Sequence, residues 1–379
     1  MEVFHHIKYA SAGRFAEPVV APYTEQERHN GLLTSFPQGQ FRLGKVMGES
    51  QPLRQTEDAH YLSIYTPARQ GCRPVLFWIH GGAFIAGSGE EDTYDASALS
   101  QEGNIVVVTV SYRLGVFGYL YDETLPCQDM GLKDQMAALR WVHQNIHLYG
   151  GDASKITVAG QSAGGYSVAA LLQTVKEPLF RRAIIQSAPF AITTNRRKAS
   201  RIAHNIQEIL GKPIMEASTE DILKAQASFL AHSGNMMPFE PVMPDINKPI
   251  QTQGLERVLI TWQKDDLSPF VEMKLGGNSP LKRALNRCLA RCLSFLSIYL
   301  PSKSFAKRLR HQGINAEVRR FDWCPEGSHY GACHCLELAL LFGDWNRWHD
   351  VAMLGKTSRE EWQQRGKRLR SEWIDFIKS

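Results

Sequence analysis

Ser162, in the segment Gly160–Gly164, is the residue whose neighbours point most directly to covalent chemistry. The segment reads Gly-Gln-Ser-Ala-Gly, which matches the G-x-S-x-G pattern of a nucleophile on a sharp strand-to-helix turn. The flanking glycines are needed because so tight a turn leaves no space for side chains beside the serine. The following helix directs its N-terminal N–H groups and partial positive charge toward a reacting carbonyl. The pattern therefore predicts that Ser162 attacks a carbonyl carbon.

A second glycine-rich segment, Trp78–Phe84, reads WIHGGAF and follows a predicted strand. In enzymes with a serine on such a turn, an HGG loop supplies backbone N–H groups to the oxyanion hole. The residue after the nucleophile supplies another. The predicted donors in this chain are the N–H groups of Gly82, Ala83 and Ala163. Either segment alone could be an ordinary glycine turn, but their occurrence together favours catalysis.

Ser162 needs two partners before it can react. A histidine must take its proton, and a carboxylate must fix the tautomer of that histidine. In the chain order typical of this turn, the acid follows the serine and the histidine comes last. Six histidines follow Ser162, so the local pattern alone does not identify the base.

Apolar runs on either side of these motifs predict the strands that position them. Runs this uniformly apolar are typical of strands covered on both faces, as in a parallel sheet. Helical spacing lies between them, for example over Gly131–Asn145 and Tyr166–Thr174, and this alternation predicts an α/β fold. The expected strands are Tyr61–Tyr65, Pro74–Ile79, Ile105–Ser111, Lys155–Ala159, Ala183–Gln186, Val258–Ile260 and Glu317–Phe321.

We expect one α/β domain over residues 1–379, because no linker-like stretch or internal repeat divides the chain. Residues 1–56 are polar and turn-rich, with few strong strands. They are expected to lie around the start of the sheet. Residues 191–250 and 270–312 interrupt the alternation with helical or irregular stretches. They are expected to form cap-like insertions over the edge of the sheet.

Six segments between residues 57 and 188 carry motifs of one enzyme family. They are Glu57–Pro67, the HGGAF loop, Val110–Gly115, Gln128–Gln135, Tyr149–Asp152 and Gly160–Gly165. Together they resemble the type B carboxylesterases, the family of cholinesterases and para-nitrobenzyl esterases. The resemblance implies an α/β-hydrolase fold, with helices on both faces of a mostly parallel sheet. It also implies hydrolysis of carboxylic esters through an acyl-enzyme, with no cofactor. The chain is short for this family, chiefly in the regions that shape the pocket.

The resemblance also selects the base. The histidine motif of the family, G-A-x-H-x-x-E-L, is similar to Gly331–Leu338, which reads GACHCLEL. His334 is therefore the predicted base, and His329 is the local alternative.

The predicted acid is identified by its position after the strand Val258–Ile260. In the family a glutamate follows this strand in a T-x-x-E-G pattern, and the corresponding position here is Asp266. The sequence departs from the pattern twice, with Asp in place of Glu and Leu267 in place of Gly. Asp265 is the main alternative, whereas a turn or salt-bridge role suits Asp322 better.

Gln161 precedes the nucleophile at the position where the choline-ester hydrolases of the family carry glutamate. A neutral side chain there removes one attraction for a cationic substrate. This favours a small neutral ester.

Overall composition excludes several other classes of protein. The chain has 43 Lys and Arg against 38 Asp and Glu, a net charge of +5, without the basic stripe or motif of a nucleic-acid-binding protein. No apolar run approaches the length of a membrane span, and the N-terminus lacks the pattern of a secretory signal. Seven cysteines, an odd number spread over a long chain, favour a reduced, cytoplasmic setting. The oligomeric state is not readable from these features.

Two segments suggest other chemistry. Cysteines and histidines crowd into residues 324–335, but their irregular spacing favours buried thiols over a metal site. The segment Leu281–Leu300 alternates basic and apolar residues at helical spacing. It is interpreted as a cap helix with a solvated basic face, the alternatives being a helix on a membrane surface or a gate.

Three functions fit the motifs. Ester hydrolysis is the first. The second is a catalytically silent binding protein, which the presence of both Ser162 and His334 disfavours. The third is an amidase or lactonase that uses the same triad and differs in the leaving group.

Overall fold

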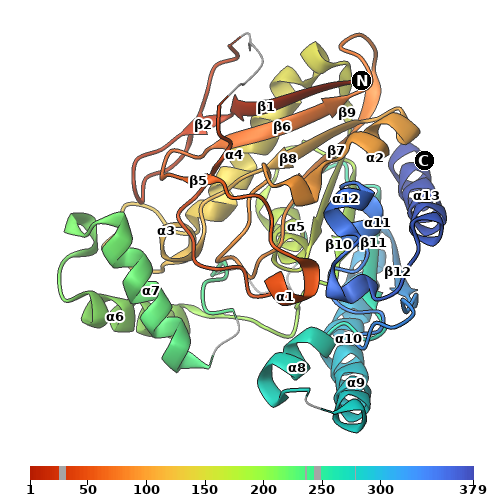
Figure 1. The fold of residues 1–379 in the computed structure, drawn as a ribbon. Coiled ribbons are helices and arrows are strands. Elements are labelled where there is room, and N and C mark those ends of the chain that lie inside the picture. The colour runs from red at the N-terminus through yellow and green to blue at the C-terminus, as the bar shows by residue number, and fades with distance from the viewer. Residues whose placement is uncertain (25–30, 235–236, 243–248, 278) are drawn as a thin grey trace.

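The computed structural model describes residues 1–24, 31–234, 237–242, 249–277 and 279–379. Within these residues an eight-stranded sheet forms the centre of the molecule (Figure 1). Five of its seven neighbouring pairs are parallel, and β6 pairs antiparallel with both of its neighbours. In spatial order the strands are β1 (Glu2–Lys8), β6 (Tyr61–Thr66), β8 (Val106–Val110), β7 (Arg73–Ile79), β9 (Gly151–Gln161), β10 (Arg182–Gln186), β11 (Arg257–Gln263) and β12 (Asn315–Phe321).

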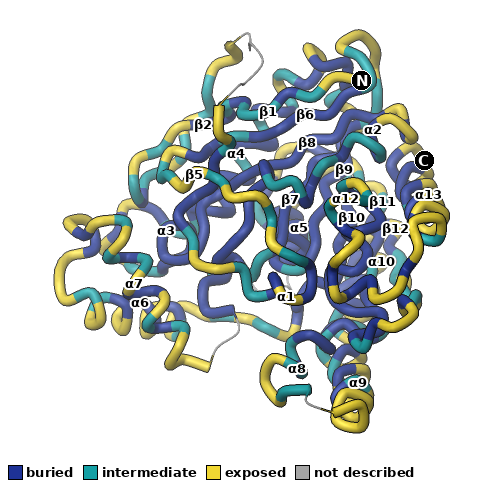
Figure 2. Tube along the Cα trace, viewed as in Figure 1, coloured by how far each residue is buried: buried dark blue, intermediate teal, exposed yellow. Residues whose placement is uncertain are grey.

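Strand β7 shows why the sheet is covered on both faces. Val75, Phe77 and Ile79 belong to the apolar core on one face. Leu76 and Trp78 belong to the core on the other. Successive side chains of a strand point to opposite faces, so a strand without polar positions must be buried on both. Strand β8 is buried along its whole length, and β7 and β9 are buried along the parts that match the uniformly apolar runs, which are dark blue in Figure 2.

Helices supply the two covering layers. One face packs against α4 (Met130–Asn145), α5 (Ala163–Thr174) and α10 (Leu300–His311). The other face packs against α2 (Ser97–Gly103), α11 (Leu338–Leu341) and α13 (Arg359–Lys378). The prediction of a mostly parallel sheet with helices on both faces is confirmed.

The two expected insertions lie apart in Figure 1. The first contains α6 (Arg196–Leu210) and α7 (Thr219–Ser233). The second contains α8 (Ser268–Leu275), α9 (Pro280–Ser294), a π-helical turn (Phe295–Tyr299) and α10. Because α10 packs on β11 and β12, it is the crossover helix between these parallel strands. Shorter elements are α1 (Gly44–Met47), α3 (Gly115–Tyr119), α12 (Trp345–Trp348), β2 (Ala10–Ser11), β3 (Val19–Val20), β4 (Thr34–Ser35) and β5 (Arg54–Gln55).

Strand β1 was not predicted. Its sequence, EVFHHIK, lacks a clear apolar alternation, and it lies at the edge of the sheet, where pairing is needed on one side only. Among the described residues no helix is both long and apolar enough to cross a membrane.

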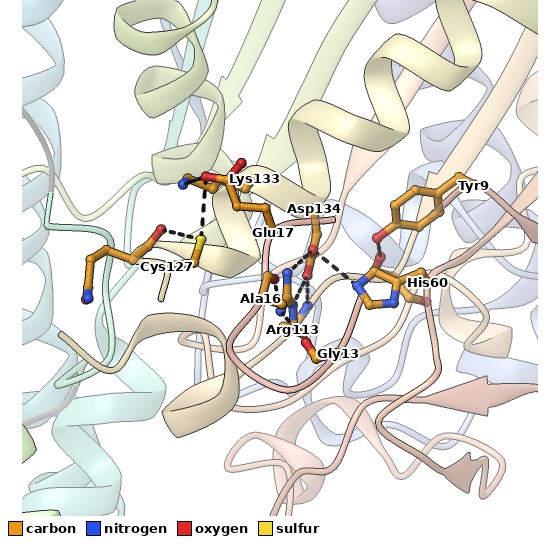
Figure 3. Close-up of polar contacts among 11 residues, drawn as sticks. Tyr9, Gly13, Ala16, Glu17, His60, Arg113, Cys127, Lys133 and Asp134 are labelled. Carbon is orange, nitrogen blue, oxygen red and sulfur yellow. Dashed lines mark hydrogen bonds and ion pairs between the residues drawn. The ribbon is translucent and has the colours of Figure 1, made fainter. Parts of the chain in front are cut away.

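A buried ion-pair cluster joins the N-terminal segment to the sheet (Figure 3). Asp134 on α4 accepts hydrogen bonds from Arg113 Nε at 2.8 Å and Nη2 at 2.7 Å. His60 Nε2 lies 3.2 Å from the same carboxylate. Arg113 Nη1 in turn donates to the carbonyl of Ala16 at 2.8 Å. The motifs around Arg113 and Asp134 therefore hold the N-terminal segment against residues that flank the sheet.

Candidate active site

Ser162 occupies the turn between β9 and α5 with φ 56° and ψ −120°. This is a backbone conformation that residues with a side chain rarely adopt. A Cβ atom at Gly160 would lie 2.5 Å from the carbonyl carbon of Gly164, and one at Gly164 would lie 2.1 Å from the carbonyl oxygen of Ile79. The two glycines are therefore required by sterics, as the pattern predicts.

His334 and Asp266 meet beneath the same turn. Nδ1 of His334 lies 2.5 Å from Oδ1 of Asp266, and both side chains are buried. The other oxygen, Oδ2, accepts from the hydroxyl of Ser187 at 2.7 Å and the N–H of Gln263 at 3.0 Å. These donors fix the carboxylate, which in turn keeps the proton of His334 on Nδ1. Nε2 is then the nitrogen that can accept a proton.

The alternative candidates for the acid and the base form ion pairs with other residues. Asp265 points to Arg291, with Oδ1 2.9 Å from Nη2 and 3.0 Å from Nε, and it also accepts from the N–H of Ala332. His329 lies 3.0 Å from Glu272. Asp322 pairs with Arg320 on the surface.

Gln161 contacts the proton-accepting nitrogen of His334. Its Nε2 lies 3.1 Å from Nε2 of His334, so the amide donates to the atom that would take the proton of Ser162. The sequence suggested only an effect of Gln161 on substrate charge. The contact with His334 could not be read from it, because 173 residues separate the two side chains.

The HGG loop has three successive residues with positive φ: Gly82 at 109°, Ala83 at 54° and Phe84 at 61°. A Cβ atom at Gly82 would lie 1.9 Å from the carbonyl oxygen of Ala86, so this position needs glycine. Among the described residues, no protein acceptor takes the N–H groups of Gly82, Ala83 or Ala163. All three are available to a bound oxygen atom.

His80 holds this loop in place rather than acting as a second base. Burial lowers the pKa of His80 to about 4, so the ring is neutral at pH 7. Its Nδ1 donates to the carbonyl of Gly81 at 2.7 Å, and its ring stacks on Tyr112 with the centroids 4.3 Å apart.

A cavity of about 410 Å³ opens onto Ser162 and His334. Most of its lining is apolar, and Arg42 is the single Lys or Arg that lines it among the described residues. No Asp or Glu of the described chain lines it. Its apolar lining includes Phe41, Leu43, Met47, Ile85, Ala86, Tyr94, Ile192, Met237, Leu267, Phe270, Leu293, Ile298 and Leu338. A larger cavity of about 670 Å³ includes neither Ser162 nor His334 in its lining.

Glu337, three residues after His334, is also buried. Burial and the charge of Asp266 raise the pKa of Glu337 to about 8, so it is mostly protonated at pH 7. It lines a cavity of about 90 Å³ together with Gln186, Thr261 and Gln263. A protonated Glu337 leaves Asp266 as the negative charge next to His334.

The cysteines and histidines that crowd into residues 324–335 differ in burial. No group of three or more His, Cys, Asp and Glu side chains in the described part of the chain is arranged to hold a metal ion. Burial raises the pKa of the Cys333 and Cys335 thiols well above the usual range. These two thiols are buried on either side of His334 in the sequence, whereas Cys324 is exposed.

The chain is similar to known proteins over most of its length. The sequence profile described as "Carboxylesterase family" matches residues 1–294. The chain is 36% identical to "Probable N-octanoylanthranilate hydrolase AqdA2" of Rhodococcus erythropolis over 411 aligned positions, which cover 99% of this chain and 88% of that protein. It is 32% identical to "Para-nitrobenzyl esterase" of Bacillus subtilis (strain 168), covering 86% of this chain and 75% of the relative.

Solved structures show the same fold. A structure titled thermophilic PNB esterase superposes with a TM-score of 0.82 at 29% identity, covering all of this chain and 87% of the other. A carboxylesterase of Geobacillus stearothermophilus superposes with a TM-score of 0.78 at 27% identity, covering 99% of this chain and 86% of the other. The prediction of an α/β-hydrolase fold is confirmed.

Proposed function

Because the chain belongs to the carboxylesterase family and is a serine hydrolase of carboxylic esters, we propose that Ser162, His334 and Asp266 form its catalytic triad. The contact between His334 and Asp266 at 2.5 Å, in the cavity that Ser162 also lines, carries this proposal. Ser162 Oγ attacks the ester carbonyl while Nε2 of His334 takes its proton. His334 then returns the proton to the leaving alcohol, and water, activated by the same nitrogen, releases the acid.

The proposed oxyanion hole consists of the N–H groups of Gly82, Ala83 and Ala163. A donor of this kind stabilises the charge that develops on the carbonyl oxygen, and removing one typically costs about 3 kcal/mol in the transition state. The positive φ angles of the loop and the absence of other acceptors among the described residues support this role. No cofactor takes part in this mechanism.

The triad acid is tested by a matched pair of variants, Asp266→Asn and Asp265→Asn. Asp266→Asn should lower kcat for p-nitrophenyl butyrate by about 10³–10⁴-fold, because the amide favours the wrong tautomer of His334. Asp265→Asn should keep kcat within about tenfold of the wild type, since the contacts of Asp265 are with Arg291 and the N–H of Ala332 rather than with His334. Circular dichroism would verify folding of both variants. A loss confined to Asp265→Asn would contradict the assignment.

The cavity also bears on the substrate. Its apolar lining favours a hydrophobic acyl chain, and the neutral side chain of Gln161 gives no attraction for a cation. Both observations support a neutral ester as substrate. Arg42 in the same wall adds a site that could also accept an anionic leaving group.

A second candidate function follows from Arg42 and from one relative. That relative is named for N-octanoylanthranilate, a compound that joins an eight-carbon acyl chain through an amide to an aromatic carboxylate. Arg42 is half-buried, and this burial lowers the pKa of its guanidinium. A carboxylate on the leaving group would gain a charge-assisted hydrogen bond there.

The test compares octanoylsalicylate, its amide counterpart N-octanoylanthranilate, and the uncharged p-nitrophenyl octanoate. Arg42→Gln should raise KM for octanoylsalicylate by about tenfold or more, with KM for p-nitrophenyl octanoate unchanged. Equal effects on both esters would show that Arg42 only supports the pocket wall. Turnover of N-octanoylanthranilate at a rate comparable to the salicylate ester would establish amide hydrolysis as well.

We also propose that the whole chain forms one catalytic domain and acts in the cytoplasm. One sheet spans strands from Glu2 to Phe321, and all seven cysteines are free thiols, which supports a reducing compartment. Limited proteolysis and cell fractionation test these two statements.

A further inference from the structure

Three of the four leucines of helix α9 lie on the side that faces away from the protein. Leu281, Leu285 and Leu289 recur every four residues and are 72%, 62% and 43% exposed, and Leu296 in the following π-helical turn is 57% exposed. The buried side of α9 consists instead of Asn286, Ala290 and Ser294. This is the reverse of the pattern of a helix that packs on a core and meets water. We call the four exposed leucines the outer stripe.

The charge of the same segment indicates which kind of partner could bind the outer stripe. Residues 280–312 contain eight Lys and Arg and no Asp or Glu. Two copies of such a surface would repel each other if they met through their own outer stripes. An anionic lipid surface has the opposite charge, and a basic amphipathic helix with leucines on its apolar face is suited to lie in its headgroup region.

The position of α9 links this surface to the active-site cavity. Leu293, Ser297 and Ile298, on and just after α9, line the cavity that holds Ser162. The exposed face of α9 is at the lower tip of the molecule in Figure 2, where it projects beyond the sheet. The same helical segment thus forms a wall of the cavity and carries an exposed apolar surface.

We propose that the outer stripe and the Lys and Arg side chains of residues 280–312 dock the enzyme on anionic lipid surfaces. Docking would place the leucines among the lipid headgroups, exposed basic side chains of the segment such as Lys282 against the phosphates, and the active-site cavity close to the bilayer. Arg291 would keep its pairing with Asp265. Hydrophobic esters dissolved in the lipid would then reach Ser162 without crossing bulk water. The binding is peripheral and reversible.

Vesicle co-sedimentation measures the binding of the protein to lipid directly. The full-length wild type should bind vesicles of 30% phosphatidylglycerol in phosphatidylcholine at 0.1 M NaCl, and should bind pure phosphatidylcholine far less. The double variant Leu285→Ser/Leu289→Ser should lower the partition coefficient by about tenfold or more, because the buried apolar area is lost. Lys282→Gln and Lys307→Gln should each lower it by about fivefold.

A matched control changes two exposed apolar residues on other elements, Leu148→Ser/Ile209→Ser, where the side chains are 37% and 45% exposed. This control should bind vesicles as the wild type does. All of these variants should hydrolyse soluble p-nitrophenyl butyrate at the wild-type rate, which shows that they fold.

Two results would overturn the proposal. One is a wild type that stays in the supernatant with the anionic vesicles. The other is a wild-type dimer, seen by light scattering, that Leu285→Ser/Leu289→Ser converts to a monomer while vesicle binding is unaffected. The second result would assign the outer stripe to another copy of this chain.

Discussion

Replacing Ser162 with alanine should lower kcat for p-nitrophenyl butyrate by about 10⁵–10⁶-fold, the loss expected when a triad nucleophile is removed. Alanine keeps the volume of the turn while it removes the attacking oxygen. A small rate above that of water should remain, because the oxyanion hole and the binding cavity still act on the substrate. Steady-state kinetics at saturating substrate, with protein quantified by absorbance, would measure this change.

His334→Ala supplies the companion experiment. The double variant Ser162→Ala/His334→Ala should be about as slow as either single variant, since the two residues act as a unit. A fluorophosphonate probe should label Ser162 in the wild type, as mapped by mass spectrometry, and should leave Ser162→Ala unlabelled. Substantial turnover by folded Ser162→Ala would exclude it as the nucleophile.

Replacing Asp134 with alanine should destabilise the protein by about 3–5 kcal/mol, since it leaves Arg113 buried without its counter-charge. Arg113 is 4% exposed and Asp134 fully buried, so water cannot replace the lost carboxylate. The midpoint of urea unfolding, monitored by tryptophan fluorescence, would measure the change. Replacing both partners with apolar residues, Asp134→Leu/Arg113→Met, should recover part of the loss.

An exposed ion pair gives the control. Glu177→Ala, which breaks a surface pair with Arg140, should change the free energy of unfolding by less than about 1 kcal/mol. Equal destabilisation by Glu177→Ala and Asp134→Ala would show that burial of the pair does not matter.

The contribution of Asp134 depends on pH in a direction that can be worked out. Burial alone would raise its pKa, but the neighbouring His60 and Arg113 more than offset this and hold the pKa of Asp134 well below its usual range. A carboxylate with a lowered pKa stabilises the folded state above its unfolded pKa of about 3.9. That contribution falls as the pH drops below this value toward the folded pKa. The stability difference between wild type and Asp134→Ala should therefore be largest near neutral pH and shrink in acid.

The sequence was most informative where local sterics dictate residue type. The elbow around Ser162 requires glycines at fixed positions, and β7 must be apolar at every buried position, so both could be predicted from short segments. The choice between Asp265 and Asp266 could not, because neighbouring residues differ only in the direction their side chains take. That direction is set by contacts with Arg291 and His334, which are distant in sequence.

Other features depended on packing that no local pattern encodes. The segment Leu281–Leu300 was predicted as a helix, but its periodicity could not show that the leucines face outward and that Ala290 faces inward. Strand β1 was missed because its two histidines interrupt the apolar pattern, and pairing with β6 stabilises it instead.

The order of the proposed triad along the chain has a consequence for synthesis. The elbow around Ser162 is built from β9 and α5, whereas His334 follows Gln161 by 173 residues and Asp266 by 68. At about 5–20 residues per second, a ribosome needs on the order of ten seconds or more to progress from the nucleophile to its base. During that interval the nascent chain carries a serine without a base. The first hydrolytic turnover therefore requires synthesis through His334, which follows β11 and β12 in the chain, and not only the folding of the elbow.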